Sequence, residues 1–146
     1  MKKDSRFVIV GLGLLGGAYA LGLRKAGFEH VAAIDLKEEA LAFAKEKNYI
    51  EEGRTEGFEA LLARADYVIF SLYPTAFIQW VEKHGTLLPA GCLCTDVSGV
   101  KAGLVEKVQA LLPEGVEFIA SHPMAGKERS GVENAHLVDF APANFL

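Results

Sequence analysis

The chain has 146 residues, of which 51% are hydrophobic and 23% charged, and it carries a formal net charge of −4. This composition excludes a disordered chain, and the length suits one domain with one core. The lysines and arginines are scattered and give no basic footprint for nucleic acid, so the expected partners are small molecules or protein subunits.

Short apolar runs alternate with amphipathic segments along the chain. Strands are predicted at residues 7–10, 31–35, 49–51, 67–72, 92–96 and 116–120, and helices at 14–25, 38–47, 58–62, from Pro74 onward, and at 100–112. A polar loop follows at 121–131, and a further strand is predicted where the chain ends at 144–146. Apolar strands that alternate with helices are typical of a parallel sheet covered on both faces.

A glycine-rich turn, GLGLLG, begins at Gly11, between the first predicted strand and the first predicted helix. Gly11 allows the tight turn, Gly13 lets the backbone approach a pyrophosphate, and Gly16 lets the helix pack against the sheet. The unpaired N–H groups at the helix start, with Leu14 and Leu15, would face the phosphates. The turn predicts a dinucleotide site, and a structural turn without a ligand is the alternative.

Asp35 comes at the end of the second predicted strand, nineteen positions after Gly16. A carboxylate there can accept hydrogen bonds from the adenosine ribose, and it repels the 2′-phosphate of NADP. It favours NAD as the cofactor, although Lys37 nearby leaves NADP open, and a helix cap is the alternative role. The predicted fold class is therefore α/β of the Rossmann type, a doubly wound, mostly parallel sheet with helices on both faces.

His122 follows the strand predicted at 116–120, with one residue between them. Ligands of open α/β sheets bind outside the carboxyl ends of the strands, so this histidine lies at the functional edge. An imidazole with a pKa near ~6.5 can accept the hydroxyl proton when an alcohol loses hydride to NAD. A histidine that only bonds to a neighbouring loop is the alternative, and His30, His84 and His136 are expected to be surface residues.

Three segments together resemble the prephenate dehydrogenases of the tyrosine pathway: GLGLLGGAYALGLRKAG, TDVSGVK and SHPMAGKERSGVENA. Many dehydrogenases share the first segment, whereas the HPMAG-x-E-x-SG loop is far more specific. The resemblance covers essentially the whole chain. It implies an oxidative decarboxylation in which prephenate and NAD give 4-hydroxyphenylpyruvate, carbon dioxide and NADH.

The resemblance also implies roles for individual residues. His122 matches the catalytic histidine, which is hydrogen-bonded to the ring hydroxyl and accepts its proton as hydride leaves. Ser98 is the candidate for a family serine that orients this histidine and contacts the nicotinamide, although the S-G-V-K segment here is one position displaced. Glu128 matches a glutamate on the substrate side, and the turn Ser71-Leu72-Tyr73-Pro74 would flank the nicotinamide.

Family members continue into a mostly helical domain that forms the dimer and supplies an arginine for a substrate carboxylate. Because this chain stops within an apolar run, we expect residues 1–146 to be the NAD-binding domain of a longer, cytoplasmic, homodimeric protein. Alone, it is expected to bind the cofactor with little or no turnover. No metal, membrane or nucleic-acid partner is expected, and Cys92 and Cys94 are expected to be thiols rather than a disulfide framework.

Several alternatives stay open. The substrate can be arogenate instead of prephenate, or the chain can belong to another hydroxyacid dehydrogenase that begins with the same glycine turn. A non-catalytic dinucleotide sensor would keep the glycines and Asp35 and would have no need of His122. The uncharged run at 7–23 resembles a secretory signal, but its five glycines and the loss of the first strand argue against cleavage.

Overall fold

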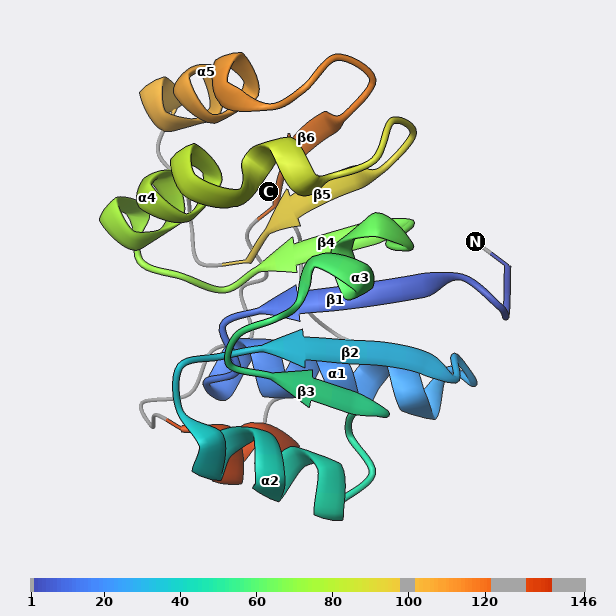
Figure 1. Ribbon diagram of the computed structural model, residues 1–146. Coiled ribbons are helices and arrows are strands. Elements are labelled where there is room, and N and C mark those ends of the chain that lie inside the picture. The colour runs from blue at the N-terminus through green and yellow to red at the C-terminus, as the bar shows by residue number, and fades with distance from the viewer. Residues whose placement is uncertain (1, 98–101, 122–130, 138–146) are drawn as a thin grey trace.

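The computed structural model describes residues 2–97, 102–121 and 131–137. Within this part of the chain, six strands form one parallel sheet in the order β3-β2-β1-β4-β5-β6 (Figure 1). The strands are β1 (Arg6–Val10), β2 (His30–Ile34), β3 (Glu52–Arg54), β4 (Tyr67–Phe70), β5 (Leu93–Asp96) and β6 (Glu117–Ala120). The helices are α1 (Leu14–Lys25), α2 (Glu38–Glu46), α3 (Glu59–Ala63), α4 (Pro74–His84) and α5 (Ala102–Leu111), with 3-10 turns η1 (Gly85–Leu87) and η2 (Val132–Leu137).

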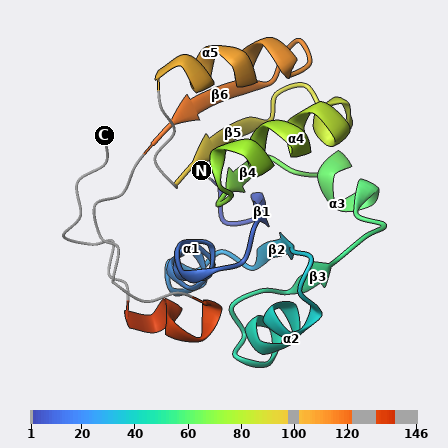
Figure 2. The same cartoon turned by 90° about the vertical axis from the view of Figure 1, so that its left-hand side faces the viewer.

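Helices cover both faces of the sheet, as predicted (Figures 1 and 2). Alternate residues of a strand point to opposite faces, so the central strands β1, β2 and β4 contribute to both of two hydrophobic clusters. Val8 packs with Phe77 in the cluster beneath α3, α4 and α5. Ile9 packs with Ala20 in the cluster on the side of α1, α2 and η2. The predicted doubly wound architecture is confirmed.

The predicted position of the third strand, residues 49–51, was wrong. Tyr49 and Ile50 are buried in the cluster on the α1 side, but they belong to the connection between α2 and β3. The strand itself follows at Glu52–Arg54, where a Cβ on Gly53 would come 3.0 Å from the Leu41 side chain. The apolar residues Tyr49 and Ile50 indicated a buried segment rather than a strand. The strand forms three residues later, where α2 packs closely on the backbone.

The other differences concern the ends of elements and the C-terminal segment. The strand predicted at 67–72 ends at Phe70, and the loop predicted at 121–131 is followed by η2, which was not predicted. The strand predicted at 144–146 lies outside the described residues.

No helix in the described ranges is long and apolar enough to cross a bilayer.

The two cysteines are buried free thiols beside and within β5. Their side chains belong to the cluster beneath α4 and α5, at the end of the strand away from its carboxyl edge. A hydrogen bond with Cys92, together with burial, raises the pKa of the Cys94 thiol above its ordinary value. Cys92 and Cys94 are therefore core residues.

Candidate functional site

The glycine turn lies at the carboxyl end of β1, between the ends of β2 and β4. The Gly11 N–H donates to the Ile34 carbonyl at 2.9 Å, and the Ser71 N–H donates to the Val10 carbonyl at 2.8 Å. Chain connections leave β1 and β4 toward opposite faces of the sheet, which makes this the topological switch point. Ligands of doubly wound sheets bind in the crevice at such a point.

Two glycines hold the turn against its neighbours. Gly11 has φ +95, and a Cβ there would lie 2.4 Å from the Ser71 carbonyl oxygen. A Cβ on Gly16 would lie 2.1 Å from the Gly11 carbonyl oxygen. No side chain fits at either position, so the first turn of α1 packs backbone to backbone against the end of β1.

Gly13 differs from these two because a Cβ there would meet no protein atom within 4 Å. It is the N-cap of α1, where no side chain caps the helix and no acidic residue occupies the first turn. The side chains of Leu14 and Leu15 pack on the α1-side cluster, which leaves their backbone N–H groups at the free end of the helix. This open, positively polarised helix end fits a phosphate group.

Asp35 lies one residue beyond β2 and bridges two turns. Its Oδ2 accepts the Leu12 N–H at 2.6 Å, and its Oδ1 accepts the Lys37 N–H at 2.8 Å. The N-cap of α2 is Lys37, which has no side-chain cap bond, so Asp35 is not the helix cap considered as an alternative. Each carboxylate oxygen keeps a further lone pair that can accept a ribose hydroxyl.

Two exposed apolar side chains flank the glycine turn. Leu36, next to Asp35, is 92% exposed, and Tyr73, after β4, is 86% exposed. Tyr73 was among the predicted site residues and Leu36 was not, since its one signal in the sequence is an apolar residue directly after the acidic one. In the same turn, Leu72 packs against the α4-side cluster and Pro74 is the first residue of α4.

Hydroxyl groups join the carboxyl ends of β5 and β6. Ser121 donates both its N–H, at 3.2 Å, and its hydroxyl, at 2.8 Å, to the Asp96 carbonyl oxygen. The Thr95 hydroxyl donates to the Ile119 carbonyl at 2.7 Å, and its oxygen is 3.0 Å from that of Ser121. These bonds fix the points from which the chain continues toward the predicted residues Ser98 and His122.

The predicted catalytic residues Ser98, His122 and Glu128 themselves lie outside the described residues. Of the other histidines, His30 pairs with Glu51 at 3.0 Å. His84 is half-buried against the rings of Phe58 and Trp80, and burial lowers its pKa. In the described ranges, no group of three His, Cys, Asp or Glu side chains is placed to hold a metal ion.

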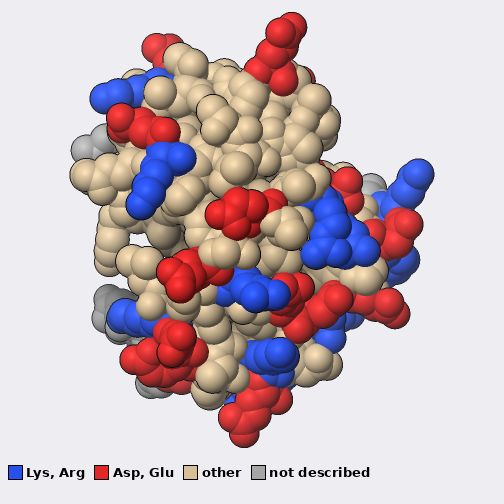
Figure 3. All heavy atoms as spheres, viewed as in Figure 1, with Lys and Arg blue, Asp and Glu red and all other residues tan. Residues whose placement is uncertain are grey.

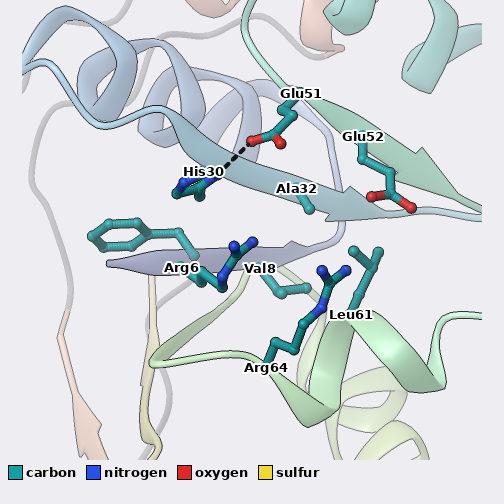
Figure 4. A pocket seen from close by; sticks show the side chains of 9 residues that line it. Arg6, Val8, His30, Ala32, Glu51, Glu52, Leu61 and Arg64 are labelled. Carbon is teal, nitrogen blue, oxygen red and sulfur yellow. Dashed lines mark hydrogen bonds and ion pairs between the residues drawn. The ribbon is translucent and has the colours of Figure 1, made fainter. Parts of the chain in front are cut away.

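Two hollows lie near the ends of the sheet. One, of about 390 Å³, lies beside Asp35 and is lined by Glu38, Leu41, Gly53, Arg54, Thr55 and Glu56. The other, of about 50 Å³, lies at the opposite edge, where side chains including Arg6, His30, Glu51 and Arg64 surround the starts of β1 and β2 (Figure 4).

Acidic and basic side chains are interspersed over the face in Figure 3.

The family described as "Prephenate dehydrogenase, nucleotide-binding domain" matches residues 19–145. A prephenate dehydrogenase of Lactococcus lactis subsp. cremoris is 32% identical over 148 residues, which cover 100% of this chain and 40% of the relative. The chain therefore spans about two fifths of the length of this relative.

Solved structures of related enzymes superpose on the chain. A prephenate dehydrogenase from A. aeolicus, in complex with hydroxyphenyl propionate and NAD+, has a TM-score of 0.85 and 29% identity, covering 97% of this chain and 49% of that one. A Synechocystis arogenate dehydrogenase has a TM-score of 0.78 and 27% identity, covering 89% and 45%.

Proposed function

Because this chain belongs to the family of prephenate dehydrogenase nucleotide-binding domains, we propose that it is the NAD-binding part of an enzyme that oxidatively decarboxylates prephenate. The product of this reaction is 4-hydroxyphenylpyruvate. The observation that carries the proposal is the open space at Gly13, at an uncapped helix end beside a bridging aspartate. A bound dinucleotide fits this arrangement of backbone donors and carboxylate acceptor.

Each part of the edge has its own role in holding NAD. The N–H groups of Leu14, Leu15 and Gly16 bind the pyrophosphate, with Gly11 and Gly13 giving the backbone room to approach. Asp35 accepts the adenosine ribose hydroxyls through its free lone pairs. Leu36 offers an apolar surface to the adenine, and Ser98 with the turn Ser71-Leu72-Tyr73-Pro74 flanks the nicotinamide.

Charge supports NAD over NADP. The 2′-phosphate of NADP would lie beside the Asp35 carboxylate, which already accepts two backbone N–H groups. The hollow next to it is lined by Glu38 and Glu56, and its arginine, Arg54, pairs with Glu52 at 2.9 Å. A phosphate dianion would therefore enter a region without a free described guanidinium to receive it.

NAD, when bound, supplies the hydride acceptor for the reaction. His122 accepts the proton of the substrate hydroxyl as the hydride leaves, Ser98 orients the imidazole, and Glu128 lies on the substrate side. The contacts of the Ser121 hydroxyl with Thr95 and with the Asp96 carbonyl support these assignments, because they hold the ends of β5 and β6 from which both segments continue. Loss of carbon dioxide then gives an aromatic ring.

The complete protein is proposed to act as a cytoplasmic homodimer, with a further domain that helps to bind prephenate. The relatives extend well beyond the region matched here. The similar Synechocystis enzyme acts on arogenate, which makes arogenate the second candidate substrate. On this proposal, the 146-residue chain alone binds NAD with little turnover.

The deciding experiment measures NADH formation by the complete natural gene product with prephenate and arogenate side by side. Turnover of prephenate with release of 4-hydroxyphenylpyruvate supports the proposal, and turnover of arogenate alone corrects the substrate. The His122→Asn variant should lose about 10²–10⁴-fold in kcat while keeping its affinity for NAD. A protein that binds NAD but turns over neither substrate contradicts the proposed enzyme and favours a sensor.

A further inference from the structure

The 3-10 turn η2 packs directly on helix α1 through Gly17 (Figure 2, where η2 is red and lies beside α1). A Cβ on Gly17 would lie 2.8 Å from Val132 Cγ2 and 2.9 Å from Ala135 Cβ. Both partners are buried: the exposed fraction is 4% for Val132 and 0% for Ala135. The contact is therefore closed on the η2 side, with no room for even one methyl group.

This contact joins two parts of the proposed site that are distant in sequence. Gly17 directly follows Gly16, in the first turns of the helix that faces the pyrophosphate. Val132 comes directly after Gly131, the last residue of the SHPMAGKERSG segment that carries His122 and Glu128. The other end of that segment, Ser121, is fixed to β5 by its bonds to the Asp96 carbonyl.

We propose that the contact of Gly17 with Val132 and Ala135 is a positioning junction for the reaction proposed above. It sets the place where the His122 segment ends relative to the helix that holds the cofactor. The proposal rests on the proposed function, because it assumes that hydride and proton leave one substrate for groups on these two elements. Such a transfer is sensitive to displacement: about 1 Å of misplacement can lower a rate by about 10²-fold.

The chemistry of the contact explains why a larger residue would shift η2 as a unit. The methyl group of Val132 can rotate away from a new Cβ, but the Ala135 Cβ is attached to the backbone and cannot. An alanine at 17 must therefore move the backbone of η2 away from α1. The pyrophosphate turn is expected to stay in place, because Gly11 packs on Ser71 and Gly16 packs on Gly11, and neither of these contacts involves η2.

The test uses Gly17→Ala in the complete natural gene product. Gly22→Ala is the matched control: it is the same substitution in the same helix, and its Cβ would meet nothing within 4 Å. The double variant Gly17→Ala/Ala135→Gly removes the atom that cannot move and serves as the rescue, with Ala135→Gly alone as its reference. The readouts are kcat and KM for prephenate, the Kd for NAD, and amide hydrogen exchange over residues 131–137.

We expect Gly17→Ala to lower kcat by roughly tenfold or more and to speed exchange over 131–137, with the Kd for NAD changed less than about threefold. Gly22→Ala should match the wild type, and the double variant should recover most of the lost kcat.

The junction is refuted if Gly17→Ala keeps its kcat while the wild type is active. It is equally refuted if the Kd for NAD rises in parallel with the loss of kcat, or if Ala135→Gly gives no rescue. A wild-type protein without turnover contradicts instead the proposed function on which the junction rests.

Discussion

The three glycines of the turn after β1 meet different surroundings. Gly11 and Gly16 face backbone atoms of the protein, whereas Gly13 faces open space. The motif predicts a separate role for each glycine: Gly11 for the turn, Gly16 for helix packing, and Gly13 for the approach of a ligand. The atoms that exclude a side chain at Gly11 and Gly16, the Ser71 and Gly11 carbonyl oxygens, are not specified by the sequence.

This difference predicts separate outcomes for two alanine variants. Gly13→Ala should lower the free energy of unfolding by no more than about 1 kcal/mol, the cost of alanine at an N-cap with φ −102 and ψ −147, because its Cβ meets no other atom. It should nevertheless weaken NAD binding by roughly tenfold or more. Gly16→Ala should lower both stability and affinity, because its Cβ would overlap the Gly11 carbonyl oxygen. Urea unfolding and NAD titration measure the two quantities, and equal effects on stability would contradict the assignment.

Asp35 is predicted to determine the choice between the two cofactors. Asp35→Ser removes the negative charge at the ribose while keeping an acceptor for one backbone N–H, so the ratio of Kd values should move toward NADP by roughly tenfold. The Kd values for NAD and NADP, titrated in parallel, give the ratio. Glu46→Ser, at the far end of α2, removes the same charge and should leave the ratio unchanged. An unchanged ratio in Asp35→Ser would mean that another group excludes the 2′-phosphate.

At the scale of elements, β5 and β6 are joined by side chains as well as by their backbone ladder. Thr95 and Ser121 have two hydroxyl protons for three short contacts, so their oxygens share one small network. Thr95→Val and Ser121→Ala should each lower the free energy of unfolding by about 1 kcal/mol. In the double variant the effects should differ from their sum by about 0.5 kcal/mol or more, and strictly additive effects in urea unfolding would show that the pair is not coupled.

The sequence predicted most elements because their signals are local. Apolar runs marked the strands of the sheet interior, and Pro74 correctly marked the first turn of α4. The signals failed where tertiary contacts decide the structure. The short polar strand β3 forms at the sheet edge and was predicted three residues early. The turn η2, with its sequence VENAHL, packs on α1 and α2, which are distant from it in sequence.

At the scale of the whole molecule, the core beneath α4 is built around Phe77. Its ring is stacked on Phe70 at 4.6 Å and lies 5.5 Å from Phe118, so it links α4 to β4 and β6. Phe77→Ala should lower the free energy of unfolding by about 3–5 kcal/mol. Tyr73→Ala, which removes an exposed ring, should change it by less than about 0.5 kcal/mol.

Unfolding of these variants can be followed in urea by the fluorescence of Trp80, which packs on Phe58 and Phe70, and by circular dichroism. The sheet is shared by both clusters, so the two signals should change together. Separate transitions would show that the two faces unfold independently.

Because Cys92 and Cys94 are buried, the reactivity of their thiols reports how often the core opens. A thiol reagent can react with either side chain only during the moments when the region around β5 opens, so the modification rate counts those openings. If the opening is global, saturating NAD should slow modification by the factor by which it stabilises the folded chain, about 100-fold at a hundred times its Kd. Cofactor binding can thus be detected as a slower rate of alkylation, with no substrate present and no turnover required.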